Sequence, residues 1–483
     1  MCYDYDYSCK HLVQDMKDNK QLCETVGMFC SFYRHSAILS HRLVEATDKY
    51  CVDWLKKYKG IPKYVYEPHS TEEIQEIVSW CHQNDYKIVP QGGNTGLVGG
   101  STPMQDEVVI NMSKMNKIHQ IDKSQSTATV DAGVILEQLN IESAKYNMMV
   151  PLDLGAKGSC QLGGNIASNA GGLRYLRYGS LFQNILALEV ALPNGQVLPM
   201  TSGMKKDNTG YHLKNLFIGS EGTLGIITKA VIQLVPLPKS TQVAVLALNS
   251  YSDVVSVFNQ AKQHLNEILS AFEFWDKGCI ELTTHKLGLR QPFDQLYPFY
   301  VLIETHGSNA KHDKEKLELF LEYAMESLVV DGTIAQSNTE VLNLWKLRES
   351  IPEACSAQGK VYKYDISLPI TKLYSLVEAS QQKINNSTQH SFSRCVGYGH
   401  MGDGNLHLNV CASEFNKQNE KLLEPFVYEF TSQLNGSISA EHGIGQMKKK
   451  VLHYSKSKEH ITLMKSIKSL IDPKNTMNPN KLF

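Results

Sequence analysis

Three runs of small residues in the first half of the chain constrain its fold most. The first run, residues 90–101, follows a short predicted strand and contains five glycines. Glycine backbone brings N–H groups close together, and such a nest suits an anion such as a pyrophosphate. Two further runs, residues 158–172 and 219–227, lie in the same half. Runs of this length favour a flat, extended cofactor held by backbone.

Two other interpretations of these glycines are less favoured. The first run lacks the Gly-Lys-Ser/Thr of a P-loop, so a nucleoside triphosphate is not expected. A flexible surface loop would be polar throughout, whereas Leu97 and Val98 interrupt the run. The stretch Gly397–Gly402 matches G-x-G-x-x-G, but the residues after it have the pattern of a strand and not of the required helix. We therefore reject a Rossmann interpretation.

Hydrophobic periodicity predicts alternating strands and helices on both sides of Pro236 and Pro238, which mark a boundary. Before the boundary, the expected helices are 70–81 and 135–146, and the expected strands are 108–112, 118–121, 127–130, 186–192 and 196–200. After it, the expected strands are 243–248, 271–274, 300–304 and 360–367, and the expected helices are 254–268, 314–328 and 373–383. This order predicts a β-α-β type sheet covered by helices.

The polar chemistry of the second half begins in the stretch Gly397–Val410. Two histidines, His400 and His407, lie on either side of an Asp403-Gly404 turn, and the flanking residues alternate as in strands. The turn folds the chain back and can bring both imidazoles to one point. A hairpin with two convergent histidines is therefore expected.

A second polar stretch, residues 439–445, contains Glu441 and His442. Two histidines and one carboxylate form the ligand set of an open catalytic zinc site, which His400, His407 and Glu441 would supply. In extended backbone His442 points away from Glu441, which suits a base beside the metal. Most histidine pairs at such spacing bind no metal, but the dense glycines around these four groups favour close approach to a ligand.

Composition excludes some classes of protein. The chain has 483 residues, enough for two or three domains, with 48 basic and 49 acidic side chains. Without a basic stripe, nucleic acid is not expected as a partner. No apolar run approaches the length of a membrane span. The 11 cysteines are scattered without pair spacing, which is typical of a reducing compartment.

The N-terminal region suggests a mitochondrial protein. Residues 28–44 contain Arg34, Arg42, three serines and bulky apolar residues, with no acid before Glu45. That composition is typical of a mitochondrial transit peptide, and Met28 could then be the working start codon. An ordinary amphipathic surface helix explains the same residues equally well.

Two cations of the second half can be interpreted in two ways. Arg348 follows Trp345, and Lys363 alternates with Val361 and Asp365 along a predicted strand. A lysine on a strand is usually a surface residue, and spacing alone favours that interpretation. Paired with Arg348, however, it could hold a carboxylate.

Several motifs in order resemble those of the FAD-linked 2-hydroxy-acid dehydrogenases, from about Pro62 to the Asn478-Pro479 tail. These motifs are residues 90–101, 151–172, 218–228, 345–348, 362–369, 397–410 and 439–445. The resemblance implies an α+β fold with a PCMH-type FAD-binding domain, a ferredoxin-like substrate domain and a C-terminal segment that returns to the flavin. The expected division is an N-terminal extension (1–57), FAD domain (58–237), substrate domain (238–436) and C-terminal segment (437–483).

The resemblance also assigns roles to residues. It implies zinc on His400, His407 and Glu441, with His442 as the catalytic base. It implies substrate contacts from Arg348, Lys363, Asn409 and His442. The residues expected to hold FAD are Gly92, Gly93, Asn94, Thr95, Gly96, Gly99, Gly100, Ser101, Pro151, Gly158, Gly163, Gly164, Asn165, Ser168, Asn169, Gly171, Gly222 and Ile227.

Two positions bear on the finer expectations. Relatives with covalent FAD carry a histidine in the first glycine loop, where this chain has Asn94, so the FAD is expected to be non-covalent. Relatives that oxidise D-2-hydroxyglutarate tend to carry a threonine four residues after the arginine, where this chain has Pro352. Proline has no donor. Either Ser350 or a water replaces that contact, or the substrate preference differs.

The implied reaction is oxidation of D-2-hydroxyglutarate to 2-oxoglutarate, with electrons passed to an acceptor such as electron transfer flavoprotein. The enzyme is expected in the mitochondrial matrix, with a homodimer as the candidate oligomeric state. A D-lactate dehydrogenase of the same family is the nearest alternative. A zinc hydrolase without flavin would leave the three glycine-rich runs unexplained. A non-enzymatic flavin-binding or scaffold protein would not need His442 and a full ligand set.

Overall fold

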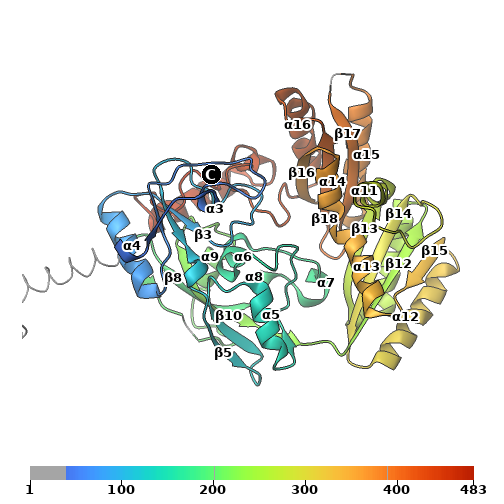
Figure 1. Ribbon diagram of the computed structural model, residues 1–483, viewed down its shortest axis with the longest axis horizontal. Coiled ribbons are helices and arrows are strands. Elements are labelled where there is room, and N and C mark those ends of the chain that lie inside the picture. The colour runs from blue at the N-terminus through green and yellow to red at the C-terminus, as the bar shows by residue number, and fades with distance from the viewer. Residues whose placement is uncertain (1–39, 201, 389) are drawn as a thin grey trace, which may run out of the picture.

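A computed structural model describes residues 40–200, 202–388 and 390–483. Two lobes lie side by side (Figure 1). The first is built on two small sheets and short helices, and the second on one large sheet with helices on both faces. The α+β expectation is confirmed.

The first sheet of the N-terminal lobe has the order β1-β2-β4-β3. Its strands are β1 (Leu43–Val44), β2 (Tyr64–Tyr66), β3 (Ile88–Gln91) and β4 (Val108–Asn111). The last three run parallel, and β1 pairs antiparallel with β2. Helix α4 (Thr71–Gln83) begins at the cap Ser70, whose side chain accepts a hydrogen bond from the backbone N–H of Glu73. Short helix α3 (Asp48–Cys51) precedes β2.

The second sheet of this lobe is antiparallel, with the order β5-β6-β10-β8-β9. Its strands are β5 (Ile118–Asp122), β6 (Thr127–Asp131), β8 (Ile185–Ala191), β9 (Val197–Leu198) and β10 (Ile226–Gln233). The expected hairpin around Asn194-Gly195 is confirmed, because β8 pairs with β9 and Gly195 takes a positive φ of 83°. A short ladder joins β7 (Met148–Met149) to β11 (Val235–Pro236). The remaining helices are α5 (Leu136–Ala144), α6 (Leu162–Ser168), α7 (Tyr175–Tyr178), α8 (Leu181–Asn184) and α9 (Lys214–Phe217).

The second lobe is one seven-stranded antiparallel sheet made of two ferredoxin-like units. The strands are β12 (Ser240–Leu248), β13 (Leu269–Asp276), β14 (Phe299–Gly307), β15 (Asp331–Ile334), β16 (Lys360–Ser367), β17 (Phe392–His400) and β18 (Asn405–Ala412). The order β15-β12-β14-β13 continues directly into β17-β18-β16. Ser437 pairs with Ser367 beside β16, where a fourth strand of the second unit would lie. The two units meet where β13 pairs with β17.

Helices cover both faces of this sheet. One face packs against α10 (Tyr251–His264), α12 (Ala310–Met325), α15 (Leu373–Asn385) and α16 (Lys417–Gln433). The other packs against α11 (Lys277–Leu287), α13 (Asn338–Glu349) and α14 (Ile351–Gln358). Alternation along the strands therefore sends one set of side chains to each core. None of the helices in the described part of the chain is long and apolar enough to cross a membrane.

The C-terminal segment returns to the first lobe after helix α17 (Lys458–Ile471). The backbone of Ile88 exchanges hydrogen bonds with Thr476 and Asn478, each 2.7 Å long, beside β3. The side chain of Asn478 donates to the backbone oxygens of Gly100 and Glu221. The last residues thus tie together two of the glycine-rich loops. The division at 57, 237 and 436 remains our proposal.

The end of the predicted transit segment belongs to the folded lobe. Residues 28–39 lie outside the described residues, but Leu43–Val44 form β1. Arg42 makes two 2.8 Å hydrogen bonds to the carboxylate of Glu73 in α4. A presequence that is removed would therefore have to end before Arg42.

The turn between β17 and β18 depends on close backbone packing, which gives a testable expectation. A Cβ on Gly399 would lie 2.0 Å from the backbone oxygen of Asn405. Gly399→Ala should therefore destabilise the protein by about 1–3 kcal/mol, the usual range for overpacking. Thermal melting of the holoprotein measures this, with Gly155→Ala as the control, because Gly155 has open space around it. Equal melting temperatures for both variants would contradict the packing argument.

Candidate active site

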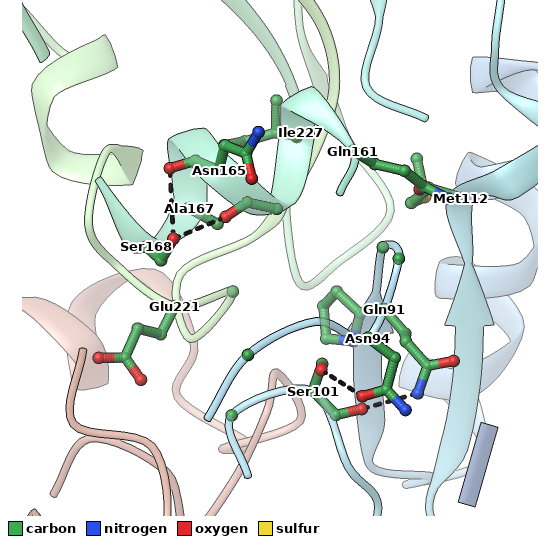
Figure 2. Close-up of a pocket in the computed structure, with 18 of the residues that line it drawn as sticks. Gln91, Asn94, Ser101, Met112, Gln161, Asn165, Ala167, Ser168, Glu221 and Ile227 are labelled. Carbon is green, nitrogen blue, oxygen red and sulfur yellow. Dashed lines mark hydrogen bonds between the residues drawn. The ribbon is translucent and has the colours of Figure 1, made fainter. Parts of the chain in front are cut away.

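A cavity in the first lobe is formed by the three glycine-rich loops (Figure 2). The loops come from the end of β3, from α6 and its preceding turn, and from the turn before β10. Most of the residues expected to hold FAD line it, namely Gly92, Gly93, Asn94, Thr95, Gly96, Gly100, Ser101, Gly163, Gly164, Asn165, Ser168, Gly222 and Ile227. Two of these loops pack directly on each other, because a Cβ on Gly93 would lie 2.1 Å from the Ser159 oxygen.

The other expected cofactor residues do not line this cavity. They are Gly99, Pro151, Gly158, Asn169 and Gly171. Asn169 ends α6 in the left-handed conformation with φ 50°. Gly171 lies against the second lobe, since a Cβ there would come within 2.6 Å of Glu441 Oε2. Contact of these five residues with the cofactor stays a prediction.

Several lining residues were not expected from the sequence. Gln91 ends β3, Gln161 precedes α6, and Glu221 lies in the third loop. Gln161 Nε2 donates to Ser113, while its buried Oε1 has no hydrogen-bond partner in the described part of the chain. A buried acceptor without a partner is costly, and a ring N–H of a flavin would satisfy it. The cavity wall therefore fits the cofactor that its glycines suggest.

Asn94 is held by the protein itself. Its Nδ2 donates to the backbone oxygens of Val52 at 2.7 Å and Lys49 at 3.2 Å. Its Oδ1 accepts from Ser101 Oγ at 2.9 Å. The Asn94 amide thus braces the loop against the residues around α3. An amide is no nucleophile, which favours a cofactor held without a covalent bond.

Strand register gathers the expected polar residues of the second lobe. His407 on β18 lies opposite Asp365 on β16 and opposite Tyr398 on β17. Two residues after Tyr398 on β17, His400 lies opposite Glu273 on β13. Because side chains alternate along a strand, these groups share one face of the sheet, with Lys363 and Asn409 two residues further along. The convergence of His400 and His407 is confirmed, with their Nε2 atoms 3.2 Å apart.

Glu273 is a buried carboxylate between two cationic groups. His400 Nδ1 lies 2.7 Å and 2.8 Å from its two oxygens, and Arg348 Nη2 lies 2.7 Å from Oε2. Burial alone would lower the pKa of His400, but the charge and hydrogen bond of Glu273 raise it to about 9. The proton on Nδ1 leaves Nε2 directed at His407, the orientation that a metal-ligating histidine needs.

Asp365 holds the loop that carries Glu441 and His442. Its Oδ2 accepts both backbone N–H groups of that pair at 2.9 Å, and its Oδ1 accepts from Asn405 Nδ2 at 2.9 Å. Burial opposes the charge of Asp365, but nearby His442 and Lys448 and the backbone donors hold its pKa below the usual range. Asp365 also lies 3.8 Å from Nδ1 of both His407 and His442.

Two overlapping groups of side chains could hold a metal ion. Ligand atoms of Asp365, His407, Glu441 and His442 all lie within 4.8 Å of one another. The expected set shares two of these, with His407 Nε2 3.8 Å from Glu441 Oε1 and 3.2 Å from His400 Nε2. Two nitrogens on one tetrahedral zinc stand roughly 3.3 Å apart. Since the oxygens of Asp365 are occupied by N–H donors, the expected set fits a metal better.

Arg348 is buried on α13. It is 4% exposed, and its guanidinium lies 4.7 Å from the ring centre of Tyr398. Despite the close ion pair with Glu273, its Nε and Nη2 have no hydrogen-bond partner among the described residues. Asn409 Nδ2 donates to Tyr398 Oη at 3.0 Å on the same side. These groups can receive a carboxylate.

A second cavity shares the lining residue His442 with the first. Lys363, half-buried on β16, lies in its wall, and burial lowers the pKa of this lysine. Burial also lowers the pKa of His442, ahead of the opposing effect of Asp365. A neutral imidazole therefore stands between a cofactor cavity and a cationic cavity, beside a potential metal site. That arrangement suits proton removal from a bound acid.

Comparison with known proteins supports this assignment. The family described as "FAD binding domain" matches residues 62–201, and "FAD linked oxidases, C-terminal domain" matches residues 237–482. The structure of p-cresol methylhydroxylase with substrate bound aligns with a TM-score of 0.74 at 15% identity, covering 93% of this chain and 95% of that chain. That likeness shows the fold. The match to the FAD-binding family shows that FAD is the cofactor of this chain.

Relatives narrow the family further. A rice protein (Oryza sativa subsp. indica) with the name "Probable D-2-hydroxyglutarate dehydrogenase, mitochondrial" is 50% identical over 436 residues, covering 89% of this chain and 77% of the relative. A Schizosaccharomyces pombe protein with the name "Putative D-lactate dehydrogenase C713.03, mitochondrial" is 45% identical over 487 residues, covering 98% of this chain and 93% of the relative. The chain is an FAD-dependent oxidoreductase and belongs to the D-2-hydroxyglutarate dehydrogenase family of FAD-linked oxidases.

Proposed function

We propose that this protein oxidises D-2-hydroxyglutarate to 2-oxoglutarate with non-covalent FAD and a zinc ion. The observation that carries the proposal is the place of His442. It lines both the FAD cavity and the lysine-bearing cavity, with the histidine and carboxylate cluster beside it. A zinc hydrolase would leave the FAD cavity unused.

His400, His407 and Glu441 are the ligands we propose for zinc. Two imidazoles and one carboxylate leave a coordination position for substrate. Glu273 orients His400, and Asp365 orients His407 and the backbone of Glu441. Carboxylates behind the ligands fix the ring orientation and raise ligand basicity. Asp365 is therefore a positioning residue in this proposal.

His442 is the proposed base. Its Nδ1 lies 3.8 Å from Asp365 Oδ2, and its Nε2 faces Glu441 at 3.9 Å. We assign removal of the C2 hydroxyl proton to Nε2, while the charge of Asp365 stabilises the imidazolium that forms. When bound, FAD accepts a hydride from C2 and zinc acts as a Lewis acid on the C2 hydroxyl.

Arg348, Lys363 and Asn409 are the proposed contacts of substrate carboxylates. Arg348 can donate to a carboxylate from Nε, which has no hydrogen-bond partner among the described residues, and Lys363 adds a point charge. A dicarboxylate needs more than one such cation, because an unpaired charge in a partly buried site is costly. The presence of both side chains therefore favours the diacid.

D-lactate is the second candidate substrate. The fission yeast relative bears that name and aligns with nearly the whole chain. Pro352 lies at the start of α14, where it offers no donor to a distal carboxylate. A monocarboxylate would not need that donor.

We propose electron transfer flavoprotein as the electron acceptor, which is tested by the reoxidation of the reduced enzyme. We propose a homodimer as the oligomeric state, which is tested by the mass of the protein in solution.

The metal assignment predicts a specific loss. His400→Ala and His407→Ala should each lose bound zinc and lower turnover at least roughly 10- to 100-fold, the range for loss of even an outer partner. Both should keep FAD that acid precipitation releases into the supernatant. The measurements are metal content, flavin content and turnover with a dye acceptor. The exposed His285 provides the control variant His285→Ala. Full activity of wild type with well under one zinc per chain would exclude the assignment.

The carboxylate assignment predicts substrate choice. Wild type should have a higher kcat/KM for D-2-hydroxyglutarate than for D-lactate. Arg348→Lys should lower kcat/KM for the diacid about ten- to a hundredfold, because losing a charge-assisted hydrogen bond costs roughly 1.5–3 kcal/mol. Pro352→Thr should raise it or leave it unchanged. The exposed Arg290 gives the control Arg290→Lys. If wild type prefers D-lactate, the D-lactate alternative replaces the assignment.

We also propose the mitochondrial matrix as the location, because the relatives named above are called mitochondrial. A chain beginning at Met28 and fused to a fluorescent protein should enter mitochondria. Arg34→Glu should reduce import, since presequences are basic and acid-poor. Arg42 is a poor position for this test because it pairs with Glu73 in the folded lobe. Cytosolic fluorescence of the Met28 chain would contradict the proposal.

A further inference from the structure

The residues that line the second cavity range from exposed to buried. At the rim lie Lys57, Lys360 and Phe415, all exposed. Lys363 and His442 are half-buried in the wall, and Lys448 is buried. Lys448 is only 2% exposed. The cavity therefore leads from solvent to the proposed base.

The charge of this cavity is strongly one-sided. Four lysines line it against a single carboxylate, Glu424, although the whole chain has a net charge of −1. The FAD cavity, by contrast, has no lysine or arginine in its lining. Cations gathered along a low-dielectric wall raise the local concentration of anions and speed their association. The lysines are thus placed where an anionic ligand would be drawn inward.

Access to His442 from the first lobe would be closed in the working enzyme. His442 is reached through two cavities, and the first holds FAD. A hydroxy acid that binds after the cofactor needs another way to the base. The second cavity is such a way, because its lining comes from segments outside the FAD loops, including β16 and α16, and from Leu97 and Val98 at their edge.

We propose that the second cavity is the access route for the anionic 2-hydroxy acid and for release of the 2-oxo acid. In this route the exposed Lys57 and Lys360 steer the anion inward, and the deeper Lys363 receives it beside His442. The route rests on the proposed function for the identity of its ligand. Lys57 and Lys360 take no part in the proposed reaction, so the path and the steering are additional to it.

Lys448 serves a different purpose and is not a suitable probe. Its Nζ donates to the backbone oxygen of Ile438 at 2.8 Å and lies 3.5 Å from that of Asp365. Replacing it would disturb the loop that carries His442. Within the described part of the chain the rim lysines make no such hydrogen bond; Lys360 lies 6.0 Å from the ring centre of Phe415 and Lys57 lies 5.9 Å from that of Tyr58. Lys57 also interacts with the charge of Glu424, so Lys360 is the cleaner of the two positions for a charge reversal.

The test measures the association rate of 2-oxoglutarate with the FAD- and zinc-loaded enzyme, followed by the flavin absorbance in stopped flow. Lys57→Glu and Lys360→Glu should each lower the second-order rate constant about three- to tenfold at low salt. The difference should shrink as ionic strength rises above about 0.1 M, where the screening length is about 10 Å. Lys311→Glu, an exposed change of equal charge on α12, should have no effect.

A steric variant checks the path independently of charge. Ser356 lies exposed in the lining on α14, so Ser356→Trp should slow association at every ionic strength, whereas the exposed Ser308→Trp outside the cavity should not. Rates equal to wild type in all cavity variants, or no binding of 2-oxoglutarate by wild type, would overturn the route. Wild-type turnover of D-2-hydroxyglutarate is measured separately. Its absence together with slowed association would refute the substrate and leave the route standing.

Discussion

The site depends on two buried carboxylates, Glu273 and Asp365. Moving a carboxylate into a protein interior costs several kcal/mol unless donors and cations satisfy its oxygens. Glu273 is satisfied by His400 and Arg348, and Asp365 by two backbone N–H groups and Asn405. Each carboxylate thus fixes groups from more than one element. Removing either one would leave several buried donors without partners.

This arrangement explains why a joined pair of ferredoxin-like units suits the chemistry. The strands of the two units meet where β13 pairs with β17, and that ladder places Glu273 opposite His400. The next ladder places His407 opposite Tyr398, and the guanidinium of Arg348 packs over the ring of Tyr398. His400, His407, Lys363 and Asn409 are therefore positioned by strand pairing, which is more rigid than a loop. Arg348 comes from α13, and Glu441 and His442 come from one loop.

The sequence predicted the local features well and the long-range ones poorly. Asp403-Gly404 and the flanking alternation indicated the hairpin, because a tight turn depends on the types of a few adjacent residues. Glu273 lies 127 positions from its partner His400, and nothing in its own surroundings marks it as more than a strand residue. Spacing favoured a surface position for Lys363, which is half-buried, because burial is decided by the elements packed against a residue. The glycines at 99 and 171 indicated close packing, but the sequence could not identify the residues they pack against, which are Tyr58 and Glu441.

The loop that carries His442 must be held from both lobes if the base is to face two cavities. From the second lobe Asp365 accepts the backbone N–H of His442. From the first, the carboxylate of Glu221 accepts those of Ile444 and Gly445 at 2.7 Å, and Asn478 binds the backbone of Glu221. Glu221 also lines the FAD cavity. The lining of the first cavity and the placement of the base therefore share one side chain.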